Sequence, residues 1–113
     1  TTDLVISSAG RIPNTDQLGL ANVGVTFDRH GIQVNDHLQT ANPHIYAIGD
    51  VSDTPVPKLT PVAGFEARYL VGELTHPGAA IKYPVVPTQV FAAPKLAQVG
   101  ISAAAATCRN LES

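Results

Sequence analysis

Residues 40–50 read Thr-Ala-Asn-Pro-His-Ile-Tyr-Ala-Ile-Gly-Asp, so that a polar turn leads into an apolar run and a Gly-Asp pair. The run Ile45 to Ile48 predicts a short buried strand. Gly49 has no Cβ, and a ligand or a second backbone can therefore approach it closely. Asp50 carries a carboxylate, which accepts hydrogen bonds from hydroxyl groups such as those of a sugar alcohol. A Gly-Asp pair alone is typical of an ordinary turn, whereas the complete pattern predicts a ligand site at the end of a strand.

The residues that follow predict an amphipathic helix from Thr60 to about Thr75. Thr60 can cap free backbone N–H groups, Pro61 is favoured at the first helical position, and Pro77-Gly78 ends the pattern. The first turn of a helix leaves backbone N–H groups unpaired at the positive end of its dipole. Residues 60–63, Thr60, Pro61, Val62 and Ala63, could therefore bind an anion or a developing negative charge; the alternative is an ordinary surface helix. Apolar side chains recur at helical spacing, at Ala63, Ala67, Leu70, Val71 and Leu74.

The N-terminal residues predict a strand, a turn and one helical turn. Leu4 to Ile6 is consistent with a buried strand, and Gln17 to Leu20 with a turn of helix. Between them, Gly10 permits close approach of a ligand, and Arg11 is able to contact a phosphate or a carboxylate. A turn with a solvated arginine explains the same residues equally well.

Two strand pairs are predicted elsewhere in the chain. Residues 25–27 and 32–34 alternate apolar and polar side chains around a loop that ends in Gly31, which predicts a β-hairpin. Residues 88–92 and 96–99 predict two more short strands, and Ser102 could cap a last helix. The character of the sequence changes near residues 79–84, which we therefore take as the candidate domain boundary.

Composition excludes several classes of protein. Hydrophobic residues make up 44% of the 113, enough for a core, whereas charged residues make up only 14%. So little charge predicts surface that is covered by further chain, a cofactor or a subunit. The net charge of -2 and the lack of a Lys/Arg cluster predict no nucleic-acid partner. No apolar run approaches the roughly 20 residues of a membrane span, which predicts no membrane partner. Because the chain opens on Thr1 and reads like the middle of a fold, we expect a piece of a longer protein.

Redox and metal chemistry are also constrained. Cys108 is the only cysteine, so neither an internal disulfide nor a dithiol pair can form within the chain. This usage is compatible with a reducing cytosol, and we expect a cytoplasmic protein. The four histidines are scattered and predict no metal site.

Taken together, the motifs resemble those of the FAD-dependent pyridine nucleotide-disulfide oxidoreductases (class I), the family of glutathione reductase, dihydrolipoamide dehydrogenase and mercuric reductase. The resemblance runs from Leu4 to about Ser102, and residues 40–50 are similar to the second FAD fingerprint of that family. The motifs also occur in the family's order: Gly10-Arg11-x-Pro13-Asn14-Thr15, the hairpin, Tyr46-Ala47-Ile48-Gly49-Asp50, Thr60-Pro61-Val62-Ala63, and Pro87-Thr88-x-Val90-Phe91.

The resemblance implies a role for each motif. Asp50, after Gly49, would hydrogen-bond the ribityl chain of FAD. The backbone of residues 60–63 would face the flavin pyrimidine carbonyl. Gly10 and Arg11 would lie where the chain leaves the nicotinamide-nucleotide domain and returns to the FAD domain. The co-substrate would be NADPH or NADH.

The resemblance also implies an architecture. We expect a mixed α/β fold in which residues 1–82 form the C-terminal segment of a Rossmann-like FAD-binding domain, with a β-hairpin or meander. Residues 83–113 would begin an α+β dimerisation domain, so the complete protein would be a homodimer.

The function implied is part of a flavoprotein disulfide reductase that moves electrons from NAD(P)H through FAD to a small disulfide. Residues 59–63 are more similar to glutathione reductases than to lipoamide dehydrogenases, although a longer loop at residues 53–57 leaves the substrate class open. Alternatives are dihydrolipoamide dehydrogenase, mercuric reductase, a single-cysteine NADH-dependent flavoprotein, and a non-catalytic assembly module with a vestigial FAD motif. The sequence has no Gly-x-Gly-x-x-Gly and no redox cysteine pair, so we expect no catalytic residue here and an inactive isolated chain.

Overall fold

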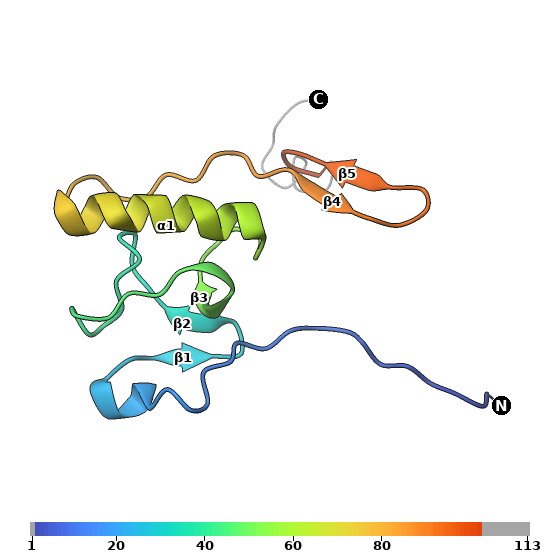
Figure 1. Cartoon of the computed structure of the whole chain (residues 1–113), viewed down its shortest axis with the longest axis horizontal. Coiled ribbons are helices and arrows are strands. Elements are labelled where there is room, and N and C mark those ends of the chain that lie inside the picture. Colours follow the sequence, from blue (N-terminus) through green and yellow to red (C-terminus); the bar gives the residue numbers. More distant parts are fainter. Residues whose placement is uncertain (1, 103–113) are drawn as a thin grey trace. The chain divides into compact units, whose positions relative to one another are not determined.

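The computed structural model describes residues 2–102 and divides into two compact units between Ile81 and Lys82 (Figure 1). Each unit has its own secondary structure. The division falls within the stretch 79–84, where the sequence changes character.

A three-stranded sheet forms the centre of the first unit. Its strands are β1 (Phe27–Asp28), β2 (Gly31–Gln33) and β3 (Ser52–Asp53), in the order β1-β2-β3. The pair β1–β2 is antiparallel, with Phe27 opposite Ile32, which confirms the predicted hairpin. The pair β2–β3 is parallel and brings the segment after Gly49-Asp50 beside the hairpin.

Gly31 makes the approach of β3 possible. Its φ is +143°, and an added Cβ would lie 2.6 Å from the Val51 carbonyl oxygen and 2.8 Å from the Asp53 nitrogen. No side chain fits in that space. The loop before it is fixed by Asp28, whose carboxylate accepts hydrogen bonds from the backbone N–H of His30 at 2.7 Å and of Gly31 at 3.3 Å.

Apolar side chains from several segments meet in one core. The fully buried members come from the 3-10 helix η1 (Leu20–Val23), from β2 and from the loops next to the sheet. The helical turn predicted for residues 17–20 therefore lies a few residues later than expected. The buried members are Leu20, Val25, Ile32 and Ala47, and Val34, Ile45 and Val51 pack against them.

Helix α1 (Thr60–Thr75) has the predicted bounds but differs from the prediction at its start and on its buried face. Thr60 does not cap the helix, because the N-cap residue is Leu59 and no side chain caps the N-terminus. The buried residues are Val62 and Glu66, in the N-terminal half. In the C-terminal half, Val71 is exposed, although the helical spacing predicted that it would be covered.

Two predicted strands do not form as expected. Residues 4–6 have no regular structure, and their side chains are 73% to 79% exposed. In the stretch 45–48, a single antiparallel bridge joins Tyr46 to Gln39, and the Ala47 N–H donates to the Leu38 carbonyl at 3.1 Å. A strand needs a partner backbone along its whole length, and the described part of the chain supplies only this short one.

The second unit contains a hairpin of β4 (Thr88–Val90) and β5 (Leu96–Gln98), which confirms the predicted strands within shorter bounds. The apolar side chains of this hairpin are largely exposed, with Phe91 at 79% and Leu96 at 65%. The helix predicted after Ser102 lies outside the described residues. No described helix is long and apolar enough to cross a membrane.

Candidate functional site

The Gly49-Asp50 pair forms a tight turn against the start of α1. It belongs to the short 3-10 helix η2 (Gly49–Val51), directly before β3. Gly49 has φ +70°, a conformation that glycine adopts at little cost, and an added Cβ would lie 3.3 Å from the Cβ of Ala63. The structure thus brings together two predicted site segments, the Gly-Asp pair and residues 60–63.

Buried side chains hold the backbone of this turn on both sides. The Gly49 N–H donates to Glu66 Oε2 at 2.6 Å, and Ser52 Oγ donates to the Gly49 carbonyl at 2.8 Å. Glu66 and Ser52 are both 0% exposed. Hydrogen bonds to a carboxylate are short and strong, so the direction of the chain entering Asp50 is fixed.

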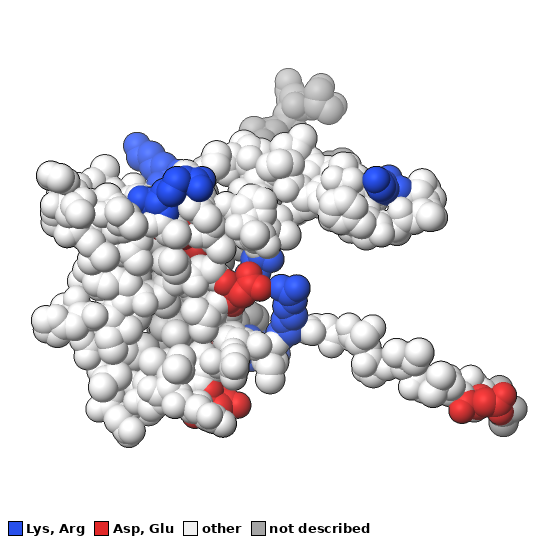
Figure 2. Space-filling view, in the orientation of Figure 1, with Lys and Arg blue, Asp and Glu red and all other residues white. Residues whose placement is uncertain are grey.

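The Asp50 side chain itself faces solvent and is 53% exposed. Its Oδ2 accepts a hydrogen bond from the Arg11 guanidinium at 2.7 Å, and Figure 2 shows acidic and basic side chains side by side on this face. Arg11 is 79% exposed, and an ion pair so open to water contributes about 0–1 kcal/mol. The pair is therefore easily exchanged for contacts with a ligand.

Asp50 and Arg11 line an open cleft of about 790 Å³. Its wall is formed by the turn after Gly10, the hairpin loop and the segment that follows η2. Cationic side chains outnumber carboxylates there, and the Lys58 ammonium also donates to the Ser52 carbonyl oxygen. The lining residues are Arg11, Ile12, Pro13, Asn14, Arg29, His30, Asp50, Val51, Asp53, Thr54 and Lys58.

The start of α1 presents backbone donors beside the turn. Thr60 and Pro61 are exposed, and no side chain caps the helix. The Ala63 N–H is already engaged, donating to the Leu59 carbonyl at 3.0 Å. The earlier part of the first turn and the positive end of the dipole remain available to a carbonyl oxygen or an anion.

These features fit a flavin nucleotide chemically. An exposed carboxylate on a rigid turn can accept hydrogen bonds from ribityl hydroxyls, and the glycine before it lets the turn pack closely against Ala63 of α1. The helix start can face an electron-rich carbonyl edge. Among the residues described, no group of three or more His, Cys, Asp or Glu side chains is arranged to hold a metal ion.

Gly10 and Arg11 were predicted from the sequence as site residues, whereas Glu66 and its contact with the turn were not. A glutamate in a helix is usually solvated, so its residue type gave no signal. Its spacing of four residues from Val62 places both on one face of α1, but only the structure shows that this face packs inward.

The family model of the pyridine nucleotide-disulphide oxidoreductases matches residues 1–67, more than half of the chain. The chain therefore belongs to this family, as the ordered motifs predict.

Individual relatives agree with this assignment. The chain is 40% identical over 110 residues to the glutathione reductase of Burkholderia cepacia, covering 95% of the chain and 24% of that protein. It is 38% identical over 111 residues to the dihydrolipoyl dehydrogenase of Bacillus subtilis (strain 168), covering 97% of the chain and 23% of that protein. The chain thus spans about a quarter of the length of these relatives.

A solved structure has the same fold. The HOCl-induced flavoprotein disulfide reductase RclA from Escherichia coli superposes with a TM-score of 0.73 at 27% identity, over 88% of this chain and 23% of RclA. The mixed α/β arrangement of the chain thus resembles part of a flavoprotein disulfide reductase. The relatives do not resolve the substrate, because glutathione reductase and dihydrolipoyl dehydrogenase match about equally well.

Proposed function

We propose that residues 1–82 form the C-terminal segment of the FAD-binding domain of a flavoprotein disulfide reductase, in which Asp50 hydrogen-bonds the ribityl chain of FAD. One observation carries this proposal. The Asp50 carboxylate is exposed at a cleft, while the backbone of Gly49 before it is held on both sides by buried side chains. A carboxylate presented in this way is preorganised to accept hydrogen bonds from hydroxyl groups.

Residues 60–63 form the second contact of the proposed site. The Cβ of Ala63 lies next to Gly49, so a ligand held by Asp50 is near the start of α1. The positive end of the helix dipole favours negative charge on the pyrimidine edge of the flavin. FAD, when bound, supplies the electron transfer between the nicotinamide and the disulfide.

Gly10 and Arg11 form the third part of the proposed site. The Arg11 guanidinium lies 2.7 Å from Asp50 Oδ2, so it is close to any ligand that the Asp50 carboxylate binds. The turn at Gly10 then marks the return of the chain from the nicotinamide-nucleotide domain. Both residues thus act at the flavin and not in the chemical step.

The proposed complete protein is a cytoplasmic homodimer that uses NADPH or NADH to reduce a small disulfide, most similar to glutathione reductase. Residues 83–113 would begin its dimerisation domain, and the exposed apolar side chains of the β4–β5 hairpin are compatible with an interface. The similarity of residues 59–63 to glutathione reductases supports this substrate. With one cysteine in 113 residues, the chain alone has no dithiol pair and is proposed to be inactive.

A second candidate is a dihydrolipoyl dehydrogenase. The observation in its favour is the 38% identity to the Bacillus subtilis enzyme, which extends over 97% of the chain. The two candidates differ in the disulfide that is reduced, and turnover of glutathione disulfide against lipoamide by the complete protein separates them.

Replacement of Asp50 by alanine in the complete protein tests the FAD contact. We expect Asp50→Ala to lose flavin during dialysis that the unchanged protein survives, because the ribityl hydroxyls lose a charged acceptor. Flavin content is measured by absorbance against protein concentration. An unchanged flavin content in Asp50→Ala contradicts the assignment of Asp50.

A further inference from the structure

Two buried or half-buried glutamates on α1, Glu66 and Glu73, each join the helix to a separate loop. They are seven residues apart, close to two helical turns, and so project from the same side of the helix. Each accepts a hydrogen bond from the backbone N–H of a glycine, Gly49 for Glu66 and Gly78 for Glu73. Only the first of these glycines lies beside a proposed ligand residue.

The Glu66 carboxylate is buried and accepts hydrogen bonds on both of its oxygens. The side chain is 0% exposed, and its two oxygens face different segments. Oε2 accepts the Gly49 N–H at 2.6 Å, and Oε1 accepts the Thr54 hydroxyl at 3.3 Å. Burying a carboxylate is costly unless its oxygens are hydrogen-bonded, so hydrophobic packing alone does not explain the burial of Glu66.

These contacts lie on both sides of Asp50 in the sequence. Gly49 precedes Asp50 directly, and Thr54 follows it by four residues. The Glu66 carboxylate thus hydrogen-bonds both ends of the short segment that contains Asp50 and holds this segment against the first turns of α1. A Cβ added at Gly49 would lie 3.3 Å from the Cβ of Ala63, one turn earlier on α1, so the Gly49 turn packs closely against this part of the helix.

We infer that Glu66 is a positioning residue for FAD binding, acting by holding the Gly49-Asp50 turn so that the Asp50 carboxylate meets the ribityl chain. This inference rests on the proposed function of Asp50. Glu66 does not touch the ligand in this arrangement. It fixes the backbone from which the ligand-binding side chain projects, and it ties that backbone to the helix start that forms the other contact.

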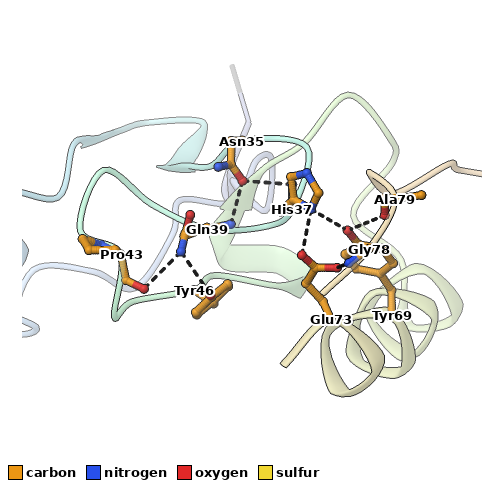
Figure 3. A network of polar contacts seen from close by, with 9 residues as sticks. All are labelled: Asn35, His37, Gln39, Pro43, Tyr46, Tyr69, Glu73, Gly78 and Ala79. Atoms are coloured by element: carbon orange, nitrogen blue, oxygen red, sulfur yellow. Dashed lines mark hydrogen bonds and ion pairs between the residues drawn. The ribbon is translucent and has the colours of Figure 1, made fainter. Parts of the chain in front are cut away.

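Glu73 provides the matched control. Its carboxylate accepts the Gly78 N–H at 3.0 Å and lies 2.9 Å from His37 Nδ1, in the network drawn in Figure 3. Its side chain is 12% exposed, so it is also largely covered. Glu73 therefore shares the helix, the residue type and the glycine contact of Glu66, but it lies away from the Gly49 turn.

The test measures the dissociation constant of FAD for the complete protein carrying Glu66→Leu, Glu66→Gln or Glu73→Leu. We expect Glu66→Leu to weaken FAD binding by about tenfold or more, the size of a lost charge-assisted hydrogen bond. Glu66→Gln keeps an oxygen acceptor for Gly49 and restores binding to within about threefold. Glu73→Leu leaves binding unchanged even where it lowers the melting temperature equally. Equal losses of binding in Glu66→Leu and Glu73→Leu overturn the inference.

A double-mutant cycle separates positioning from general destabilisation. If Glu66 acts through Asp50, adding Glu66→Leu to Asp50→Ala weakens binding by no more than about twofold further. Fully multiplicative losses overturn the inference. Unchanged binding in Asp50→Ala alone contradicts the proposed function, and the inference with it, whereas a loss in Asp50→Ala without one in Glu66→Leu contradicts only the inference. If the Glu66→Leu variant does not fold, the Glu66→Asp variant, whose side chain is shorter by one methylene, takes its place in every comparison.

Discussion

Replacement of Gly49 by alanine is expected to damage both the stability of the turn and the binding of FAD. At φ +70° an L-residue is strained by about 1–2 kcal/mol. The new Cβ would also lie 3.3 Å from the Cβ of Ala63, a distance shorter than an ordinary van der Waals contact. A small shift of η2 away from α1 is needed to relieve this close contact. We assign about 1 kcal/mol more to this contact, at the low end of the cost of overpacking. The expected total is about 2–3 kcal/mol.

Gly24 offers a closely matched control for this substitution. Its φ is +73°, nearly that of Gly49, but an added Cβ would meet nothing within 4 Å. Gly24→Ala therefore carries the backbone strain alone, about 1–2 kcal/mol. The assay is urea unfolding of both variants, followed by the flavin content of the complete protein. Gly49→Ala should be the less stable variant and the only one that loses flavin. Equal stabilities together with equal flavin contents would show that the close approach of Gly49 to Ala63 affects neither property.

Two further expectations concern the hairpin. Gly31→Ala places a Cβ 2.6 Å from the Val51 carbonyl oxygen, so the β2–β3 pairing must open. We expect the free energy of unfolding in urea to fall by about 3 kcal/mol or more. A fall of less than about 1 kcal/mol would contradict the register of the β2–β3 pair. The backbone N–H of His30 holds the pKa of Asp28 below its ordinary value of 3.8. A carboxylate whose pKa is lower in the folded than in the unfolded protein stabilises the fold at pH values above its unfolded-state pKa. This stabilisation is lost as the pH falls through the folded-state pKa. The stability difference between the unchanged chain and Asp28→Asn should therefore shrink below about pH 4, and a constant difference would contradict this contact.

The sequence predicted helix α1 and the β1–β2 hairpin because residues within or next to each element determine where it begins and ends. Thr60-Pro61 and Pro77-Gly78 bracket α1, because proline favours a first turn and cannot continue a helix. The hairpin around Gly31 followed from alternation and a glycine at the loop end. The resemblance to the disulfide oxidoreductases rested on ordered motifs, and the family match confirms it.

Features that depend on distant partners were not predictable in the same way. Residues 4–6 have the composition of a buried strand, but a strand forms only where another backbone receives its hydrogen bonds. The Arg11–Asp50 contact joins residues 39 apart in sequence, and nothing local to either residue specifies it. The burial of Glu66 likewise depends on the packing of η2 against α1, which a helical pattern does not contain.

A crystal structure of the complete protein with FAD would show whether the Asp50 carboxylate binds the ribityl chain. We expect an Asp50 carboxylate oxygen within about 2.5–3.0 Å of a ribityl hydroxyl. We also expect that the Gly49 N–H still donates to Glu66. An Asp50 carboxylate that contacts Arg11 alone, with the ribityl chain bound by other residues, would show that Asp50 is not the ribityl contact.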